Sequence, residues 1–141
     1  MKTTEDGEKY VADTHAILWH LSSDSRLSTE ARRRFLMADH GEAIIYISAI
    51  TPIEIIYLVE KNKIPERSLN QFRERVGSEP EESYQLVNLS YDLAFSIAKV
   101  PRTVVPELSD RIIAATSYYL NLPLITKDSR IQQWDGIVTV W

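Results

Sequence analysis

The 141-residue sequence contains no cysteine. Disulfide bonds, thiolate nucleophiles and zinc sites of the cysteine type are therefore excluded. No apolar run approaches the roughly 20 residues needed to cross a bilayer. The first residues, MKTTEDGEKY, are polar and of mixed charge, unlike a signal peptide. We expect a soluble, cytoplasmic protein in which residues 1–8 form a polar tail and residues 9–141 form one domain, since no repeat or long linker divides them.

An excess of basic residues is also missing. The 16 Lys and Arg residues are outnumbered by 20 Asp and Glu residues, which gives a formal net charge of −4. Domains that bind nucleic acid through phosphate contacts alone are usually basic. Either nucleic acid is not the ligand, or the contact is local and partly mediated by a cation, and the charge alone leaves both possibilities open.

Short apolar segments alternate with helical patterns along the chain. The patterns predict strands at residues 10–12, 43–47, 84–89, 123–126 and 137–141. They predict helices at residues 14–21, 28–37, 51–62, 65–76, 91–100 and 108–120. Such alternation is typical of a parallel sheet with helices on both faces. Ligands of these sheets gather at the carboxyl ends of the strands.

Acidic residues occupy the positions where this architecture predicts a ligand site. Asp13 and Asp128 directly follow predicted strands, whereas Glu54 and Asp110 lie in the first turns of predicted helices. Each acid also has a purely structural interpretation, because carboxylates cap helices and are favourable near helix N-termini. Taken singly, none of them identifies a site; in one doubly wound sheet, all of them converge.

Glu54 is the most informative of these acids. Thr51 and Glu54 have the spacing of a capping box, but the residues from Ile55 to Val59 are apolar around nearly the whole helix. We therefore expect this helix to be buried and Glu54 to be partly desolvated. Burying an unpaired charge is costly, so a cation is expected nearby.

Converging carboxylates predict a metal site. Two carboxylates about 4 Å apart repel by roughly 4 kcal/mol at an effective dielectric near 20. Several together need a divalent cation or strongly raised pKa values. Oxygen ligands favour Mg²⁺ or Mn²⁺, and such a cation activates water and stabilises a phosphodiester in reaction. No Ser/His/Asp or Cys/His set offers an alternative nucleophile.

From Tyr10 to Trp141 the chain resembles PIN-domain proteins, in particular the toxic ribonuclease component of VapBC-type toxin–antitoxin pairs. The matching segments are VADTHAILWHL, SAITPIEIIYLVEKNKI, LSDRIIAATSYYLNLPLITKD and a terminal IVTVW. The resemblance implies a three-layer α/β/α sandwich with a central, mostly parallel twisted sheet, so that residues 9–141 form a PIN-like nuclease domain. It also implies that the metal-binding catalytic acids, which would hold Mg²⁺ or Mn²⁺, are Asp13, Glu54, Asp110 and Asp128.

The resemblance assigns auxiliary roles as well. Relatives often carry a hydroxyl beside the last acid, which corresponds to Thr126, and Thr14 is a similar helper beside the first acid. Many relatives have His and Asp-Pro before the third motif, where this chain reads VPELSD. Glu107 is therefore either an outer carboxylate or an i,i+4 partner of Arg111, and the second interpretation is slightly favoured.

The implied activity is endoribonucleolytic cleavage of RNA by a metal-activated water. The implied partners are a second copy of the chain, in a homodimer, and a cognate antitoxin that inserts a peptide into the active-site groove. Arginines that could contact RNA phosphates, although a solvated helix face is the favoured interpretation, are Arg32, Arg33, Arg34, Arg73 and Arg75. Trp19 and Tyr57 could stack on bases, although core packing is favoured for both. His15, His20 and His40 have no ligand-like spacing. His15 lies close enough to Asp13 in sequence to touch substrate, but surface or packing roles are favoured for all three.

Three other functions compete with this interpretation. A PIN-like domain that has lost catalysis would act only as a protein-interaction module. A receiver-type phospho-signalling domain would need an acidic pair after the first strand, where a lone Asp13 stands. A phosphohydrolase with an Asp nucleophile would need a second Asp two residues later, where His15 stands. The acids present favour the nuclease.

Overall fold

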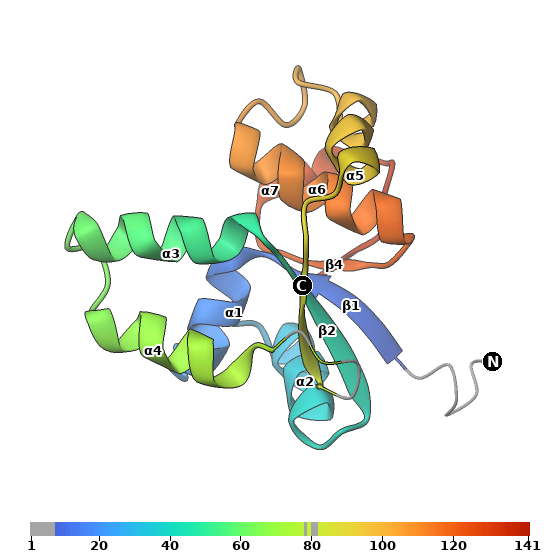
Figure 1. Cartoon of the computed structure of the whole chain (residues 1–141). Coiled ribbons are helices and arrows are strands. Elements are labelled where there is room, and N and C mark those ends of the chain that lie inside the picture. The colour runs from blue at the N-terminus through green and yellow to red at the C-terminus, as the bar shows by residue number, and fades with distance from the viewer. Residues whose placement is uncertain (1–7, 78, 80–81) are drawn as a thin grey trace.

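Five parallel strands form the central sheet of the protein, in the order β3-β2-β1-β4-β5 (Figure 1). The computed structural model describes residues 8–77, 79 and 82–141. The strands are β1 (Glu8–Ala12), β2 (Ala43–Ser48), β3 (Tyr84–Val87), β4 (Leu124–Ile125) and β5 (Thr139–Val140). Residues 1–7 of the expected polar tail lie outside the described part, and its last residue, Glu8, begins β1.

Helices cover both faces of the sheet, as the α/β pattern predicts (Figure 1). They are α1 (Thr14–Leu21), α2 (Thr29–Asp39), α3 (Ile50–Glu60), α4 (Glu66–Arg75), α5 (Tyr91–Ser96), α6 (Leu108–Leu120) and α7 (Ser129–Gln133), with a 3-10 turn at Ile97–Lys99. In Figure 1, α1, α2 and α4 lie on one side of the sheet and α5, α6 and α7 on the other. The three-layer sandwich is confirmed. None of the helices in the described part has the length and apolarity of a membrane span.

Alternation along the central strands builds the two halves of the core. Tyr10 and Ala12 of β1 pack with α1 and α2, whereas Val11 packs with α6 and with Trp134. Side chains on successive strand residues point to opposite faces, so one buried strand serves both layers. This is why β1 is apolar at every one of these positions.

The sheet order reverses at β1, which has β2 on one side and β4 on the other. The register pairs Ala12 with Ile47 and also with Ile125, so three strands end at about the same level. A doubly wound sheet binds its ligands at such a switch point, outside the carboxyl ends of the strands. A receiver domain has the strand order 2-1-3-4-5, so this order removes that alternative.

Helix α3 departs from the prediction. It begins at Ile50, so Thr51 lies inside the first turn and caps nothing; the N-cap position is held by Ala49 without a side-chain hydrogen bond. The capping-box interpretation is therefore wrong. The expectation of a buried helix is also wrong, because Ile53, Ile56 and Tyr57 are 51%, 40% and 59% exposed. Figure 1 shows why: α3 and α4 form a hairpin that extends beyond the sheet, and only one side of α3 is covered.

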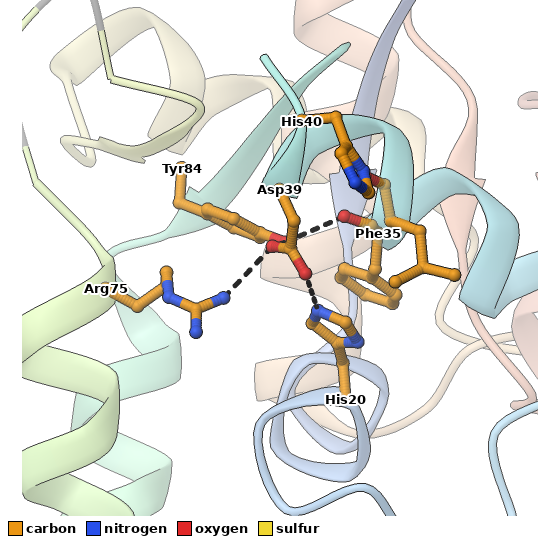
Figure 2. Close-up of polar contacts among 7 residues, drawn as sticks. His20, Phe35, Asp39, His40, Arg75 and Tyr84 are labelled. Carbon is orange, nitrogen blue, oxygen red and sulfur yellow. Dashed lines mark hydrogen bonds and ion pairs between the residues drawn. The ribbon is translucent and has the colours of Figure 1, made fainter. Parts of the chain in front are cut away.

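A second polar cluster lies near the start of β2 and β3, at the end of the sheet away from the switch point (Figure 2). Its centre is Asp39, the last residue of α2. Oδ1 of Asp39 accepts hydrogen bonds from the Tyr84 hydroxyl at 2.5 Å and from Arg75 at 3.0 Å, while Oδ2 lies 2.9 Å from Nε2 of His20. His20 also stacks on Phe35, with ring centroids 4.7 Å apart. This cluster ties α1, α2, α4 and β3 together.

Candidate active site

A pocket of about 530 Å³ opens at the switch point of the sheet. All four predicted acids and the auxiliary Glu107 contribute to its lining. The remaining lining residues are His15, Ala16, Trp19, Arg26, Ser109 and Lys127. The structure therefore brings together every carboxylate that the sequence assigns to the site, from four separate segments of the chain.

Asp13 is the most deeply buried of these acids, with 8% of its surface exposed. It follows β1 and caps α1, where one carboxylate oxygen accepts from the backbone N–H of Thr14 at 2.7 Å. The other oxygen accepts from the Thr126 hydroxyl at 2.7 Å. Burial raises the pKa of Asp13 and the charge of Glu54 adds to it, while the Thr126 hydrogen bond, the nearby His15 and the Thr14 amide oppose the rise.

Thr126 links the first acid to the last. Its hydroxyl donates to Asp13 and accepts from the backbone N–H of Asp128 at 3.0 Å. Asp128 in turn caps α7, because its Oδ1 accepts from the backbone N–H groups of Arg130 and Ile131. The capping interpretation of Asp128 is thus confirmed, and because capping occupies one carboxylate oxygen, the residue also lines the pocket.

Thr14 holds the carboxylate of Glu54, and Thr51 in turn hydrogen-bonds Thr14. The hydroxyl of Thr14 donates to Oε1 of Glu54 at 2.6 Å and lies 2.9 Å from the hydroxyl of Thr51. A hydroxyl has one proton, and that of Thr14 goes to Glu54, so Thr51 must be the donor in the second bond. Thr51 is fully buried. The sequence predicted a role in the site for Thr14 but assigned Thr51 only to a capping box.

Asp110 lies in the first turn of α6, half-buried in the pocket wall. Burial raises its pKa to about 7, together with the negative charges of Asp128, Asp13, Glu107 and Glu54. Among the described residues, no hydrogen-bond donor reaches its carboxylate. Its oxygens are therefore open to a ligand, and its raised pKa reflects burial first and the repulsion of the neighbouring carboxylates second.

Glu107 lies at the pocket and, in the described part of the chain, forms no ion pair with Arg111. It occupies the N-cap position of α6 without capping it, lines the pocket and contributes to the raised pKa of Asp110. Arg111 instead donates to the carbonyl oxygens of Ile97 and Val100, at 2.9 to 3.1 Å. The favoured interpretation as an i,i+4 ion pair is thus wrong, because the guanidinium is used to terminate the 3-10 turn.

Comparison with known proteins identifies the family of the chain. The family model described as the PIN domain matches residues 10–137. The chain belongs to the PIN domain family. It is 28% identical over 136 residues to Ribonuclease VapC22 of Mycobacterium tuberculosis, an alignment that covers 92% of this chain and 95% of that one.

Solved structures share the fold of this PIN domain. The crystal structure of VapBC2 from Rickettsia felis, bound to a DNA fragment from their promoter, has a TM-score of 0.67 at 16% identity and covers 93% of this chain and 96% of that chain. DNA-bound VapBC from Salmonella typhimurium has a TM-score of 0.67 at 20% identity, covering 94% and 96%. At these identities the likeness establishes the fold alone.

The donor chemistry of the pocket fits a hard divalent cation. Every acidic ligand candidate offers carboxylate oxygen, and their charges lie close enough to raise the pKa of Asp110. Within the described ranges, no three Asp, Glu or His side chains are already positioned to share one ion. A cation would therefore be held by part of the set with water in the other positions, which is how Mg²⁺ is commonly bound.

The PIN pocket also has a basic and aromatic wall. The pocket is lined not only by acids but also by the aromatic Trp19, the basic Arg26 and Lys127, and His15. Sequence reasoning favoured core packing for Trp19, which does pack on the core but also reaches the pocket. Arg26 and Lys127 were missed. The arginines that were proposed for RNA contact do not line this pocket; Arg33 and Arg34 pair with Glu30, and Arg75 pairs with Asp39.

Proposed function

We propose that this PIN domain is a metal-dependent endoribonuclease that hydrolyses RNA phosphodiester bonds as the toxin of a toxin–antitoxin pair. The observation that carries the proposal is the convergence of Asp13, Glu54, Asp110 and Asp128 on one pocket at the switch point of the sheet. The relative named Ribonuclease VapC22, similar over almost the whole chain, supports the substrate class.

In this proposal the acids would hold a cation, and the threonines beside them orient the acids. A divalent cation held here, Mg²⁺ or Mn²⁺, would activate a water molecule and stabilise the negative charge that develops on the phosphate. Thr126 and the Thr14 amide fix both oxygens of Asp13, so that carboxylate keeps one orientation. The Thr14 hydroxyl fixes one oxygen of Glu54 and leaves the other for ligation. Such supporting contacts are typical of metal sites.

Partners are part of the proposal. Solved structures with this fold include toxin–antitoxin complexes, which supports a cognate antitoxin for this chain, and we extend the proposal to a homodimer. The exposed apolar side chains of α3, Ile53, Ile56 and Tyr57, provide a surface that contact with another protein would cover. The same surface favours the alternative function, a PIN-like interaction module without catalysis.

A calorimetric titration with Mn²⁺ separates the two functions. The full chain, treated first with a chelator, is compared with Asp110→Asn and with the control Asp135→Asn, which changes an exposed acid outside the pocket. We expect wild type and the control to bind the cation and Asp110→Asn to lose binding at least tenfold. Each protein is then incubated with labelled single-stranded RNA. Cleavage by Asp110→Asn at the wild-type rate would refute the site, and absence of cation binding by wild type would favour the interaction module.

A further inference from the structure

Lys127 carries an unpaired positive charge beside the acidic cluster. It is exposed in the loop between β4 and α7, with Thr126 and Asp128 as its chain neighbours. Its ammonium lies 5.7 Å from the centre of the Trp19 ring. In the described part of the chain, no carboxylate comes within ion-pair distance of this ammonium, although it lines the same pocket as five of them.

The indole of Trp19 is the support on which this ammonium rests. Trp19 is itself held from two sides, by His15 at 5.8 Å and by the edge of Trp141 at 5.9 Å between ring centroids. A cation over an indole gains about 0.5–1 kcal/mol at an exposed site. That attraction holds the ammonium on the pocket wall, and because an aromatic face is not an anion, it leaves the positive charge available to a ligand.

Arg26 differs from Lys127 in this respect. Its guanidinium also lies over Trp19, at 4.8 Å, but it donates two hydrogen bonds to Asp24, at 3.0 and 2.7 Å. Its charge is therefore already matched by a carboxylate. Two cations therefore lie over the indole, and in the described part of the chain only that of Lys127 lacks a carboxylate partner, which suits this wall to phosphate recognition.

A polyanionic substrate needs such a charge at this place. The chain has a net charge of −4, and the pocket gathers five carboxylates. A cation bound by the acids can attract the phosphate that reacts, but the neighbouring phosphates of the same strand still face a negative surface. Lysine binds phosphate as a point charge without demanding a fixed geometry.

We propose that Lys127 binds a backbone phosphate of single-stranded RNA next to the scissile bond, and that Trp19 is the positioning residue that holds Lys127 there. The inference rests on the proposed ribonuclease function. It adds a residue that contacts substrate and that lies outside the acidic set.

The salt dependence of RNA binding tests this contact. The full chain carrying Asp110→Asn, which is expected not to cleave, is titrated with single-stranded oligoribonucleotides of several sequences in Mg²⁺ and increasing KCl. For single strands, each phosphate contact contributes a slope of about −0.7 to the plot of log affinity against log salt. Adding Lys127→Met should make the slope shallower by about 0.7 and weaken binding uniformly across sequences.

A matched control is available on α3. Lys61 lies over the ring of Tyr57 at 5.9 Å, in the same kind of contact, but neither residue lines the pocket. Lys61→Met should leave the salt slope unchanged. Lys127→Arg keeps the positive charge and should retain most of the slope that Lys127→Met loses. If Lys127→Met and Lys61→Met behave alike while RNA still binds, the phosphate site is refuted but the ribonuclease function is not. If the protein binds no RNA at all, both fail.

The role of Trp19 is tested by a double-mutant cycle. Trp19→Leu should weaken RNA binding at least threefold while leaving the salt slope in place, because Lys127 keeps its charge but loses its support. In the presence of Lys127→Met, Trp19→Leu should have no further effect, since contacts that act together are not additive. Effects that add fully would mean that Trp19 acts on folding and not through Lys127.

Discussion

The hydroxyl of Thr126 donates a 2.7 Å hydrogen bond to Oδ2 of Asp13, which lies 113 residues earlier in the chain. The bond is possible because β1 and β4 are parallel neighbours that end at the same level, and the backbone N–H of Asp13 donates to Ile125 at 3.0 Å just before it. The same hydroxyl accepts from the amide of Asp128. A single buried oxygen thus aligns the first and last acids of the proposed metal site.

Thr126→Val should therefore damage the site with little change in side-chain shape. The isosteric valine leaves a carboxylate oxygen of Asp13 and the amide of Asp128 without their partner. We expect a loss of about 1–2 kcal/mol in the free energy of unfolding. We also expect RNA cleavage to fall by about 10- to 100-fold, the usual effect of removing a supporting contact from a metal site. Thr126→Ser should recover both properties, and an unimpaired Thr126→Val would show that the bridge is dispensable.

The two threonines behind Glu54 should differ in their effects. Thr14 donates directly to Glu54, whereas the side-chain hydrogen bond of Thr51 within the described residues goes to Thr14. Thr14→Val should reduce cleavage by about 10-fold or more, while Thr51→Val leaves the donor to Glu54 in place and should cost about 1 kcal/mol of stability instead. Measuring the cleavage rate and urea unfolding of both variants checks that Thr14→Val mainly lowers activity and Thr51→Val mainly lowers stability. An equal loss of activity in both would mean that the relay as a whole positions Glu54.

Much of this site could be predicted because its acids lie at strand ends and helix starts, which local sequence marks well. The bounds predicted for α6, residues 108–120, agree with the structure. Thr51 and Lys127 were missed for one reason. Their partners, Thr14 and Trp19, are far away in sequence, and only the order of strands in the sheet decides that they meet.

Helix α3 shows a second limit of local pattern. Its sequence is apolar on almost every side, and this predicted burial within the domain. Hydrophobic periodicity reports that a surface avoids water but does not report what covers it. In this domain only Thr51 and Ile55 of α3 are buried by the chain itself. Local spacing also led to the error over Glu107 and Arg111, because the two residues have i,i+4 spacing but the guanidinium donates to the carbonyl oxygens of Ile97 and Val100.

Asp110 should make the folded protein less stable as the pH rises when divalent ions are absent. Its pKa is about 7 in the fold against 3.8 for an ordinary aspartate. The folded state therefore binds the proton more tightly than the unfolded chain does. Below pH 4, Asp110 does not lower the free energy of unfolding. The loss grows between pH 4 and 7, because the carboxyl ionises first in the unfolded state, and it is complete above pH 7.

Asp110→Asn removes this penalty, since the amide does not ionise. The full shift corresponds to about 4 kcal/mol, which we reduce to about 2 kcal/mol because the group is only half-buried and solvent screens it. In EDTA the variant should match wild type near pH 4 and exceed its free energy of unfolding by about 2 kcal/mol at pH 7.5. Mn²⁺ should stabilise wild type and not the variant. A pH-independent difference would mean that the fold does not raise the pKa of Asp110.

The cluster around Asp39 offers a prediction that separates stability from catalysis. Tyr84 donates its hydroxyl to Asp39 in a nearly buried position, and Arg75 lies over the Tyr84 ring at 5.6 Å (Figure 2). Tyr84→Phe keeps the ring and removes the donor, so Asp39 loses its shortest hydrogen bond. Because a carboxylate left partly unsatisfied is costly, we expect a loss of about 1–3 kcal/mol in the free energy of unfolding.

The cleavage rate should not change with this loss of stability. The cluster around Asp39 lies at the end of the strands opposite to the acidic pocket and shares no lining residue with it. Below the melting transition, the cleavage rate and the Mn²⁺ affinity of Tyr84→Phe should equal those of wild type. Tyr119→Phe, at a tyrosine that is 47% exposed, serves as the control and should change neither quantity. A Tyr84→Phe variant with normal stability and reduced cleavage would overturn the assignment, since it would place Asp39 in the same functional unit as the pocket.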